Sequence, residues 1–554
     1  MDRRSFLKLS AAGVTAAGVS SAAWGFAGRA GALPPRRGAY ERVVPEIFRP
    51  VAAPPQHSEA IVIGSGFGGA VSALRLAESG IRTTVLERGS RWPHDPRREI
   101  FGFDGRMLWH VHRSLADRSP DSTLAVPAYT QTLGEAAVID DFGGIFEFSW
   151  HRNAAIICGA AVGGGSGVYL GITVASERRP FEEVFAGTVD YDEMVQVWYP
   201  KALAGLGATT IPPDIYRANA FQNHRDFSRL ATRAGYRPRA VPGNWRWNVV
   251  RDEIAGRATP MATTGAIANS NGSLNSLDFT YLRRAEATGK ATIHPRHQVN
   301  GIHRERSGRY VLDVDYVSPY GDVLATRALT TDRLVVAAGC LGTNRLLVAA
   351  RDTGTLPNLN EHIGTGWGNN GAGTIEVGIG GTRKLQPSIG GQGFFDTEGP
   401  FARSVVNGTS SQGPLDAVTA ATSKSVVRMG ITSVDHSRGE FTYHRDNGRV
   451  ILNWPAAGHA DVVANCLRIG RRLAEKSDLP VENVVYERDT TWAHCMGGAT
   501  LGTACDEYGR VKGYRNLYVN DGAMMPGSAG ASNPSLTITA VAERNIAAII
   551  AAGG

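Results

Sequence analysis

A glycine-rich turn between an apolar run and a helical pattern constrains the fold of this chain most strongly. Residues 59–63 form a short apolar segment suited to a buried parallel strand, and helical periodicity follows through Glu78. Between them stand Gly64, Gly66 and Gly69, in G-x-G-x-x-G spacing. Such glycines permit a tight turn, a close approach of backbone to a pyrophosphate, and close packing of the helix on the strand. The segment therefore predicts a Rossmann-like βαβ unit.

The next predicted strand, residues 83–86, ends at Glu87, which lies 18 residues beyond Gly69. A carboxylate at this place can accept hydrogen bonds from a ribose diol, and it favours an adenosine with a free 2′-hydroxyl. Strand, turn, helix and acid together predict a dinucleotide-binding site. The alternative is a βα turn that binds no ligand, and the turn alone does not distinguish FAD from NAD.

The nucleotide-binding pattern resumes late in the chain, so we expect a discontinuous domain. Strand patterns at 291–293, 310–316 and 333–337 precede a helical pattern at 341–350. The 554 residues also exceed the roughly 250 to 300 that one core usually organises. We predict an α/β (α+β) protein whose Rossmann-like dinucleotide-binding domain comprises residues 57–100, 150–185, 275–368 and 485–554. A second, substrate domain on a large mixed or antiparallel sheet comprises residues 101–149, 186–274 and 369–484.

The first 32 residues are predicted to be an export signal that is not part of the fold. Arg3 and Arg4 precede a weakly apolar stretch, residues 9–27, and residues 30–32 read Ala-Gly-Ala, a suitable cleavage site. The pattern predicts twin-arginine export and a secreted, extracytoplasmic protein; an N-terminal membrane anchor is the alternative. Residues 33–56 are proline-rich, and we expect them to be extended over the surface.

Charge and cysteine content exclude some classes of function. Removal of residues 1–32, which carry Arg3, Arg4, Lys8, Arg29 and Asp2, lowers the formal net charge from +7 to +4, which is too small to predict nucleic-acid binding. The five cysteines lack C-x-x-C spacing, so neither a disulfide framework nor a metal site is expected, and most should be buried small hydrophobes. They are Cys158, Cys340, Cys466, Cys495 and Cys505.

Several blocks along the chain share their order and composition with a known family. They are residues 64–70, 163–166, 349–360 with 366–368, 514–527 and 533–545. Long, compositionally unusual blocks in one order are more specific than any single motif. On these blocks the chain resembles the glucose-methanol-choline flavin oxidoreductases, and within them most closely the bacterial cholesterol oxidases, over most of residues 57–550.

The resemblance implies noncovalently bound FAD and suggests its binding residues. Those that resemble the ADP-binding turn are Gly64, Gly66, Phe67, Gly69 and Glu87, with Val299 at the adenine. Those that resemble the loop along the isoalloxazine are Gly164, Gly165 and Ser166, followed by Tyr169. Asp521 and Gly522 resemble the pair near the ribityl chain and pyrophosphate; read alone, Asp-Gly is also a common turn dipeptide.

The resemblance assigns the chemistry to His494 and Asn533. His494 stands in the motif of residues 492–498 and resembles the family's active-site histidine, and Asn533 resembles its partner asparagine, which also contacts the flavin. Without the motif, a purely structural histidine would be the simpler interpretation. Asn533 and Pro534 also predict the N-cap and first residue of a helix at 535–548. The positive end of that helix would then face the flavin pyrimidine.

The chain departs from the cholesterol oxidase pattern in two places. Residues 403–412 lack a carboxylate where those enzymes carry the glutamate that serves as base for steroid isomerisation. Tyr169 stands where much of the family has an asparagine after the flavin loop. The first departure predicts that oxidation is not coupled to isomerisation, and the second changes hydrogen bonding at the flavin edge.

We therefore expect an exported FAD-dependent alcohol oxidase. Its substrate would be a secondary alcohol on a bulky apolar skeleton, steroid-like or polyketide-like, and O2 would be reduced to H2O2. We expect a monomer that makes transient contacts with membrane surfaces. The alternatives are a dehydrogenase that uses another electron acceptor and a flavin-binding protein without oxidase turnover. An NAD-dependent dehydrogenase would leave residues 514–545 unexplained.

Overall fold

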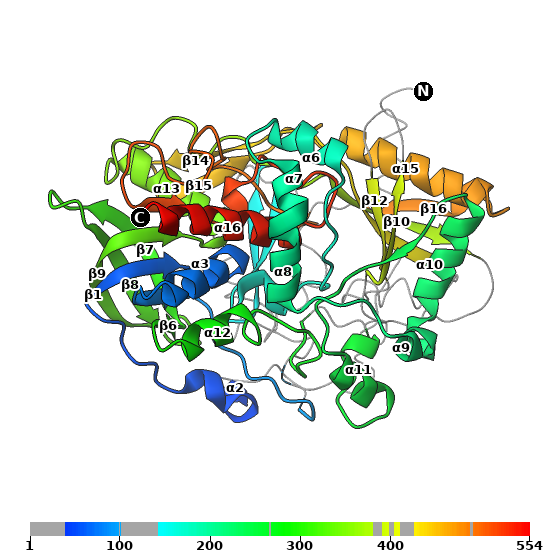
Figure 1. The fold of residues 1–554 in the computed structure, drawn as a ribbon, viewed down its shortest axis with the longest axis horizontal. Coiled ribbons are helices and arrows are strands. Elements are labelled where there is room, and N and C mark those ends of the chain that lie inside the picture. Colours follow the sequence, from blue (N-terminus) through cyan, green and yellow to red (C-terminus); the bar gives the residue numbers. More distant parts are fainter. Residues whose placement is uncertain are drawn as a thin grey trace.

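The computed structural model describes residues 39–98, 100, 142–264, 268–379, 391–397, 404–409, 426–487 and 491–553. These residues form two main sheets with helices packed against them (Figure 1). The predicted class, a mixed α/β protein with a Rossmann-like part and a second large sheet, is confirmed. The predicted export signal, residues 1–32, lies outside the described residues.

The first sheet contains the predicted dinucleotide-binding unit. Its order is β6-β2-β1-β9-β8-β7, and β18 also pairs with β9. The strands are β1 (His57–Ile63), β2 (Thr83–Leu86), β6 (Ala291–His294), β7 (His297–Arg304), β8 (Tyr310–Val317), β9 (Val323–Val336) and β18 (Leu517–Val519). β6, β2, β1, β9 and β18 are parallel, whereas β7, β8 and β9 form an antiparallel meander. The carboxyl ends of the parallel strands therefore meet at one edge.

The helices on this sheet join the two ends of the chain in one core. They are α3 (Phe67–Glu78), α12 (Tyr281–Ala287), α13 (Gly339–Thr353) and α16 (Pro534–Ala551). Figure 1 shows α3 beside α16, and small residues along α3 permit this close packing. The fully buried carboxylate of Glu543 in α16 accepts hydrogen bonds from Arg75 (2.8 and 2.6 Å) and from the Tyr281 hydroxyl (2.9 Å).

The second sheet is antiparallel, in the order β16-β10-β13-β12-β11-β5. Its strands are β5 (Arg239–Ala240), β10 (Ala372–Gly378), β11 (Gly393–Thr397), β12 (Ser404–Thr409), β13 (Val426–Thr432) and β16 (Val484–Glu487). Two amphipathic helices, α10 (Gln222–Arg233) and α15 (Ala460–Glu475), pack on one face and bury an apolar cluster there. They lie on the outer side of the sheet in Figure 1.

Smaller elements connect the two sheets, and their packing crosses the predicted domain division. β17 (Thr491–Trp492), β4 (Ala154–Gly159) and β3 (Phe146–His151) form one sheet, and β14 (Glu440–His444) with β15 (Arg449–Asn453) forms another, packed on α13. The boundary predicted between residues 149 and 150 falls inside β3, and that between 484 and 485 falls inside β16. The remaining α-helices of the described residues are α2 (Ala39–Val43), α6 (Arg178–Phe185), α7 (Tyr191–Glu193), α8 (Tyr199–Leu206), α9 (Pro213–Arg217) and α11 (Trp247–Ile254).

The expectation of an extended lead segment is wrong for residues 39–48. Helix α2 and a 3₁₀ turn at Pro45–Phe48 bury Tyr40, Val44 and Ile47, and the Tyr40 ring stacks on Phe142 with centroids 4.2 Å apart. Apolar residues at positions i, i+4 and i+7 favour a helix, because they then share one face that can pack on the protein.

Three further findings concern membrane-spanning helices, the cysteines and metal sites. Among the helices of the described residues, none has both the length and the apolar character that crossing a bilayer requires. All five cysteines are free thiols, and three of them are buried. The described residues contain no cluster of side chains able to hold a metal ion.

Candidate functional site

Glycines shape the turn between β1 and α3. Gly64 has a φ of +94°, and a Cβ there would lie 2.2 Å from the carbonyl oxygen of Ala337. A Cβ on Gly69 would lie 2.1 Å from the carbonyl oxygen of Gly64, so α3 packs directly on the end of β1. At Gly66, by contrast, no atom lies within 4 Å of an added Cβ. The open side of the turn is therefore at Gly66, where a ligand can approach the backbone.

The carboxylate of Glu87 lies beside this turn. It accepts hydrogen bonds from the amide (3.1 Å) and hydroxyl (2.7 Å) of Ser65 and from the amide of Gly89 (2.9 Å). Ser65 Oγ in turn accepts the amide of Gly163 at 2.9 Å, which ties the turn to the second glycine cluster. Burial raises the pKa of Glu87, and the Ser65 and Gly89 donors oppose that effect. Since a carboxylate has about four acceptor positions, Glu87 keeps capacity for a ribose hydroxyl.

The second glycine cluster touches the first. Gly163 and Gly164 have φ values of +92° and +53°, and a Cβ on Gly164 would lie 2.9 Å from the Cα of Gly66. The buried Ser166 hydroxyl donates to the Gly163 carbonyl (2.7 Å) and accepts the Leu277 amide (3.0 Å). The side chain of Ser166 thus holds the loop in shape. At Gly165 no atom lies within 4 Å of an added Cβ, so the loop presents open backbone there.

Asp521 and Gly522 join the start of α13 to the segment that carries His494. The carboxylate of Asp521 accepts the Thr343 hydroxyl (2.6 Å) and the Ala523 amide (2.8 Å). Burial raises the pKa of Asp521 to about 6, although these hydrogen bonds lower it. The carbonyl of Gly522 accepts the amide of Gly497 at 2.9 Å. This buried turn therefore couples two regions that lie far apart in the sequence.

An aromatic pair and an apolar strand residue complete the predicted cofactor-binding set. Phe67, the first residue of α3, meets Tyr169 edge to face with ring centroids 5.4 Å apart. The buried hydroxyl of Tyr169 has no hydrogen-bond partner within the described chain, and burial raises its pKa, so it stays a donor. Val299 is half-buried in β7, where the register with β8 shifts.

His494 and Asn533 come from different elements. The Nδ1 atom of His494 is buried without a hydrogen-bond partner in the part of the chain that the structure describes. Burial lowers the pKa of His494 to about 4, so the imidazole is neutral at physiological pH and can accept a hydrogen bond or a proton. Asn533 is 8% exposed and occupies the N-cap position of α16, followed by Pro534. Its side chain does not make the capping hydrogen bond that the sequence predicts.

One cavity of about 1140 Å³ brings the predicted residues together. Twelve of the fourteen line it: Gly64, Gly66, Phe67, Glu87, Gly164, Gly165, Tyr169, Val299, His494, Asp521, Gly522 and Asn533. Gly69 and Ser166 lie behind the lining and act through packing and hydrogen bonds. Typical small-molecule sites measure roughly 300 to 1,000 Å³, so this cavity has room for a ligand larger than usual, or for two.

The sequence did not reveal a buried ion pair network in the cavity wall. Glu147 of β3 pairs with Arg88, next to Glu87, and with Arg345 of α13 at 2.8 Å. The two guanidinium groups hold the pKa of Glu147 well below its usual range despite its burial. Gly68 was missed as well, although a Cβ there would lie 1.6 Å from the carbonyl oxygen of Asn520. The ion pairs of Glu147 and the contact between Gly68 and Asn520 join residues far apart in the sequence, so local sequence patterns do not predict them.

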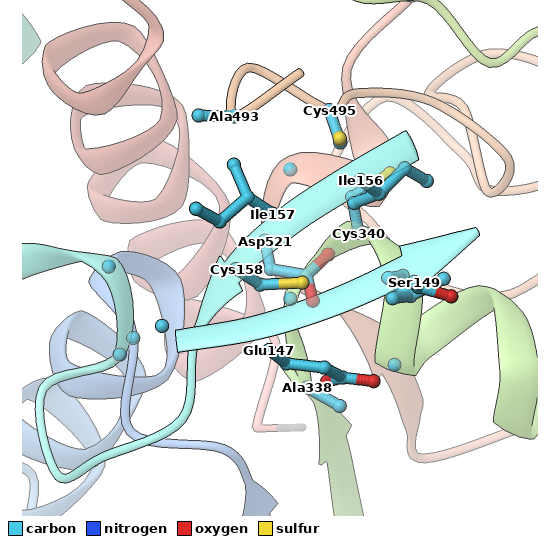
Figure 2. Close-up of a pocket in the computed structure, with 18 of the residues that line it drawn as sticks. Glu147, Ser149, Ile156, Ile157, Cys158, Ala338, Cys340, Ala493, Cys495 and Asp521 are labelled. Atoms are coloured by element: carbon cyan, nitrogen blue, oxygen red, sulfur yellow. The ribbon is translucent and has the colours of Figure 1, made fainter. Parts of the chain in front are cut away.

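Three of the five cysteines also line the cavity. Figure 2 shows Cys158, Cys340 and Cys495 around it, together with Asp521 and with Glu147 of β3. Burial raises the pKa of Cys158 to about 12, and it raises those of the other two thiols well above their usual value. The thiols are therefore protonated, and they contribute apolar lining, in line with the sequence-based expectation.

Ser149 and His151 form a hydrogen-bonded pair that lacks the geometry of a nucleophile and its base. The amide of Leu452 donates to His151 Nδ1 at 3.2 Å, so the proton of the neutral ring resides on Nε2. Nε2 then donates to the Ser149 hydroxyl at 2.9 Å, and Arg345 donates to the same oxygen. A base must accept from the nucleophile, whereas this histidine donates to it. The pair is therefore part of the cavity wall.

The residues at this site fit a bound dinucleotide with a large second ring system. Open backbone at Gly66 lies at the start of α3, where unsatisfied amides attract a pyrophosphate. Open backbone at Gly165 and the unpartnered polar atoms of Tyr169 and His494 line the rest of the cavity. Such orphaned groups are costly unless a ligand or water pairs with them.

Comparisons with known proteins agree with this geometry. A family model described as GMC oxidoreductase matches residues 419–542. A cholesterol oxidase of Mycobacterium tuberculosis (strain ATCC 25618 / H37Rv) is 27% identical over 88% of this chain and 90% of the relative. A cholesterol oxidase of Acinetobacter baumannii is 25% identical over 87% of this chain and 93% of the relative.

A solved structure described as a new fungal aryl-alcohol oxidase has a similar fold. The superposition covers 90% of this chain and all of the other chain, with a TM-score of 0.58 and 13% sequence identity. At this identity the likeness concerns the fold alone.

Proposed function

We propose a specific reaction for this chain, which belongs to the glucose-methanol-choline oxidoreductases, FAD-dependent enzymes that act on CH–OH groups. It oxidises a secondary hydroxyl on a bulky apolar skeleton, steroid-like or polyketide-like, to a ketone. The two hydrogens removed from the carbinol reduce O2 to H2O2, so atoms and electrons balance. Bound FAD supplies the intermediate two-electron acceptor for this reaction.

The observation that carries the proposal is the state of His494. Its neutral ring has an unpartnered Nδ1 atom, and its side chain lines the same cavity as Asn533. A neutral imidazole can accept the proton of a substrate hydroxyl, and the amide of Asn533 can orient the same oxygen. His94 and His294 also have a buried ring nitrogen without a partner within the described chain, but of the three only His494 lines the cavity.

The start of α16 provides electrostatic support at the same place. Asn533, Pro534, Ser535 and Ile538, all in or next to the first turn, line the cavity. The N-terminal end of a helix carries a partial positive charge, which stabilises negative charge nearby. The positive end of this 18-residue helix therefore stabilises negative charge that develops in the cavity during oxidation.

Two observations support a bulky apolar substrate. The cavity has more apolar than polar lining, with Phe146, Phe148, Trp150 and Ile172 among its walls. The relatives described as cholesterol oxidases also align along most of this chain. The apolar cavity lining and the similarity to cholesterol oxidases together support a bulky apolar skeleton for the substrate.

Anaerobic mixing of purified holoprotein with secondary alcohols tests the proposal. Sterols and macrocyclic alcohols should bleach the flavin absorbance, and admission of air should restore it with one H2O2 per alcohol oxidised. Bleaching without peroxide, but with rapid dye reduction, would show a dehydrogenase with another acceptor. No bleaching by any such alcohol would leave a flavin-binding protein without this activity.

We further propose twin-arginine export, which rests on Arg3, Arg4 and the weakly apolar stretch behind them. Replacing both arginines with lysine keeps the charge and removes the recognised pair. The folded protein should then stay in the cytoplasm, which cell fractionation would detect. Unchanged secretion of the double-lysine variant would contradict the proposal.

A further inference from the structure

One wall of the cavity is formed by the second sheet. The residues of β10 and β13 that line it are Ala372, Gly373, Thr374, Arg428, Gly430, Ile431 and Thr432. Ala372 pairs with Thr432, and Thr374 pairs with Gly430, in antiparallel register. Paired residues point to the same face of a sheet, so these four positions make one surface. That surface is built from small and polar residues.

The opposite face of the same strands is an ordinary apolar core. Val427 and Met429 alternate with the cavity positions of β13 and belong to one buried apolar cluster with Ile469 of α15. When packing alone determines the sequence, a strand that is buried on both faces of its sheet carries apolar side chains on both faces. The threonines on the cavity face therefore call for a reason other than packing.

Thr432 has a buried hydroxyl without a partner. The residue is 2% exposed, and its Oγ1 atom makes no hydrogen bond within the described chain. Other buried hydroxyls nearby are paired: Ser433 accepts from the Asn465 amide at 2.6 Å, and Ser535 donates to the Ile172 carbonyl at 3.0 Å. A buried polar group left unpaired destabilises a protein, whereas a ligand that pairs with it gains affinity.

Hydrogen bonds of neighbouring residues tie the end of β13 at Thr432 to the loop that carries Asn533. Thr432 is the last residue of β13, and the next amide, of Ser433, donates to the Gly371 carbonyl at 3.0 Å. Asn370, adjacent to Gly371, donates to the carbonyl of Ser532 at 2.7 Å, immediately before Asn533 in the sequence. The end of the wall that carries Thr432 is therefore tied to the loop that carries Asn533.

We propose that the substrate carries a second oxygen, a carbonyl or a hydroxyl, besides the carbinol that is oxidised, and that the Thr432 hydroxyl binds it. A threonine hydroxyl can donate to a carbonyl or accept from a hydroxyl, so either group fits. The inference rests on the proposed oxidase function and narrows its substrate class from a bulky apolar alcohol to a bulky ketol or diol. An ordered water is the competing partner for Thr432.

The test compares ligand binding by three forms of the holoenzyme: wild type, Thr432→Val and Thr432→Ser. The probes are a 3-ketosteroid with no other oxygen and a set of its mono-oxo derivatives, which differ in the position of the second oxygen. Dissociation constants come from the perturbation of the flavin absorbance spectrum, so the readout does not need turnover. Thr397→Val, in β11 of the same sheet but outside the cavity lining, is the matched control.

At least one mono-oxo derivative should bind wild type about 10- to 100-fold more tightly than it binds Thr432→Val. Thr432→Ser should keep most of this preference, and the ketone without a second oxygen should bind all forms alike. Equal effects of Thr432→Val on both kinds of probe, or no effect, would overturn the inference and leave a water as the partner of Thr432.

The outcome for the proposed function is separate. If alcohols bleach the flavin but no probe distinguishes the Thr432 variants, only this inference fails. If no ketone perturbs the spectrum of wild type, the proposed substrate class fails, and the inference fails with it.

Discussion

The two sheets of this protein contribute to its cavity in different ways. The first sheet offers backbone: open turns at Gly66 and Gly165 and the start of α3 line the cavity. The second sheet offers side chains, among them Thr374 and Thr432, which come from different strands. A backbone site needs glycines at set spacing, whereas a side-chain wall needs only a register between strands.

This difference means that the backbone half of the site tolerates fewer residue types than the side-chain half. A pyrophosphate and a flavin ring demand close approach to backbone, and few residues other than glycine permit it. The shape of a substrate can be matched by many combinations of side chains.

The largest effect is expected from adding one methyl group at Gly68. A Cβ there would lie 1.6 Å from the Asn520 carbonyl oxygen, so α3 or β18 must move. Gly68→Ala should destabilise the fold by more than about 4 kcal/mol, and folded protein should not accumulate. Gly66→Ala is the matched control, since no atom lies within 4 Å of its Cβ.

Gly66→Ala should therefore fold but bind FAD at least about tenfold more weakly, because the methyl group occupies the open side of the turn. Circular dichroism of the apoprotein and titration with FAD separate the two effects. A Gly66→Ala variant that binds FAD normally would show that this turn does not approach the cofactor.

Removing the imidazole of His494, which lies between the two halves of the site, should slow the reduction of the flavin by the alcohol. His494→Ala should reduce the rate of anaerobic flavin bleaching by about 10² to 10⁴, with unchanged FAD content. His436→Ala, a surface histidine paired with Glu183, should behave as wild type. Rapid-mixing absorbance measures both. A His494→Ala rate within a few-fold of wild type would remove this residue from the reaction.

Steroid isomerisation should be slower than oxidation by a factor comparable to that expected for His494→Ala. The side chains of residues 403–412, where the sequence lacks a carboxylate, lie outside the described residues. The carboxylates among the described lining residues are Glu87, Glu147 and Asp521, and each is engaged in hydrogen bonds or ion pairs. Without a positioned base, isomerisation loses roughly 10² to 10⁴ in rate.

With a 3β-hydroxy-5-ene steroid, the unconjugated ketone should accumulate before it slowly conjugates. Peroxide and the absorbance of the conjugated enone, followed in parallel, report the two steps. The carboxylates nearest in sequence to residues 403–412 are Asp396, Glu398 and Asp416. Equal initial rates of the two steps, in the wild type and after replacement of these three residues, would contradict the prediction, because another group must then supply the base.

The smallest expected effect concerns stability at low pH. Burial and the nearby Arg345 lower the pKa of His151 to about 3, whereas an unfolded histidine titrates near 6.5. Between these values the unfolded chain binds one more proton, so the free energy of unfolding falls as the pH is lowered below about 6.5. His151 contributes up to about 1.4 kcal/mol per pH unit to this slope.

His151→Gln should flatten the dependence of unfolding free energy on pH between about 6.5 and 4 by that amount. Denaturant titrations at several pH values measure the slope, and His362→Gln, at an exposed position, is the control. An unchanged slope in His151→Gln would mean that the buried ring takes up its proton without unfolding.

Sequence patterns located several elements of the first sheet closely, but they predicted neither β7 nor β18. The strand predicted at residues 83–86 is β2 with the same bounds, and the helix predicted at 341–350 lies within α13 (Gly339–Thr353). The strand predicted at 333–337 is only the end of β9, which begins at Val323. The first part of β9 shows only weak alternation of polar and apolar residues, so the sequence pattern does not predict it. Its pairing with β8 stabilises this part of the strand.

The sequence by itself determined the dinucleotide turn, the family blocks and the residues expected at the cavity, because each depends on local spacing or on long, specific motifs. Only the tertiary structure decided which of these residues line one cavity and what else lies there. The pairing of Glu147 with Arg345 spans 198 positions, and the place of Thr432 depends on its register with Ala372. Such contacts arise from the packing of distant strands and helices, which local periodicity does not encode.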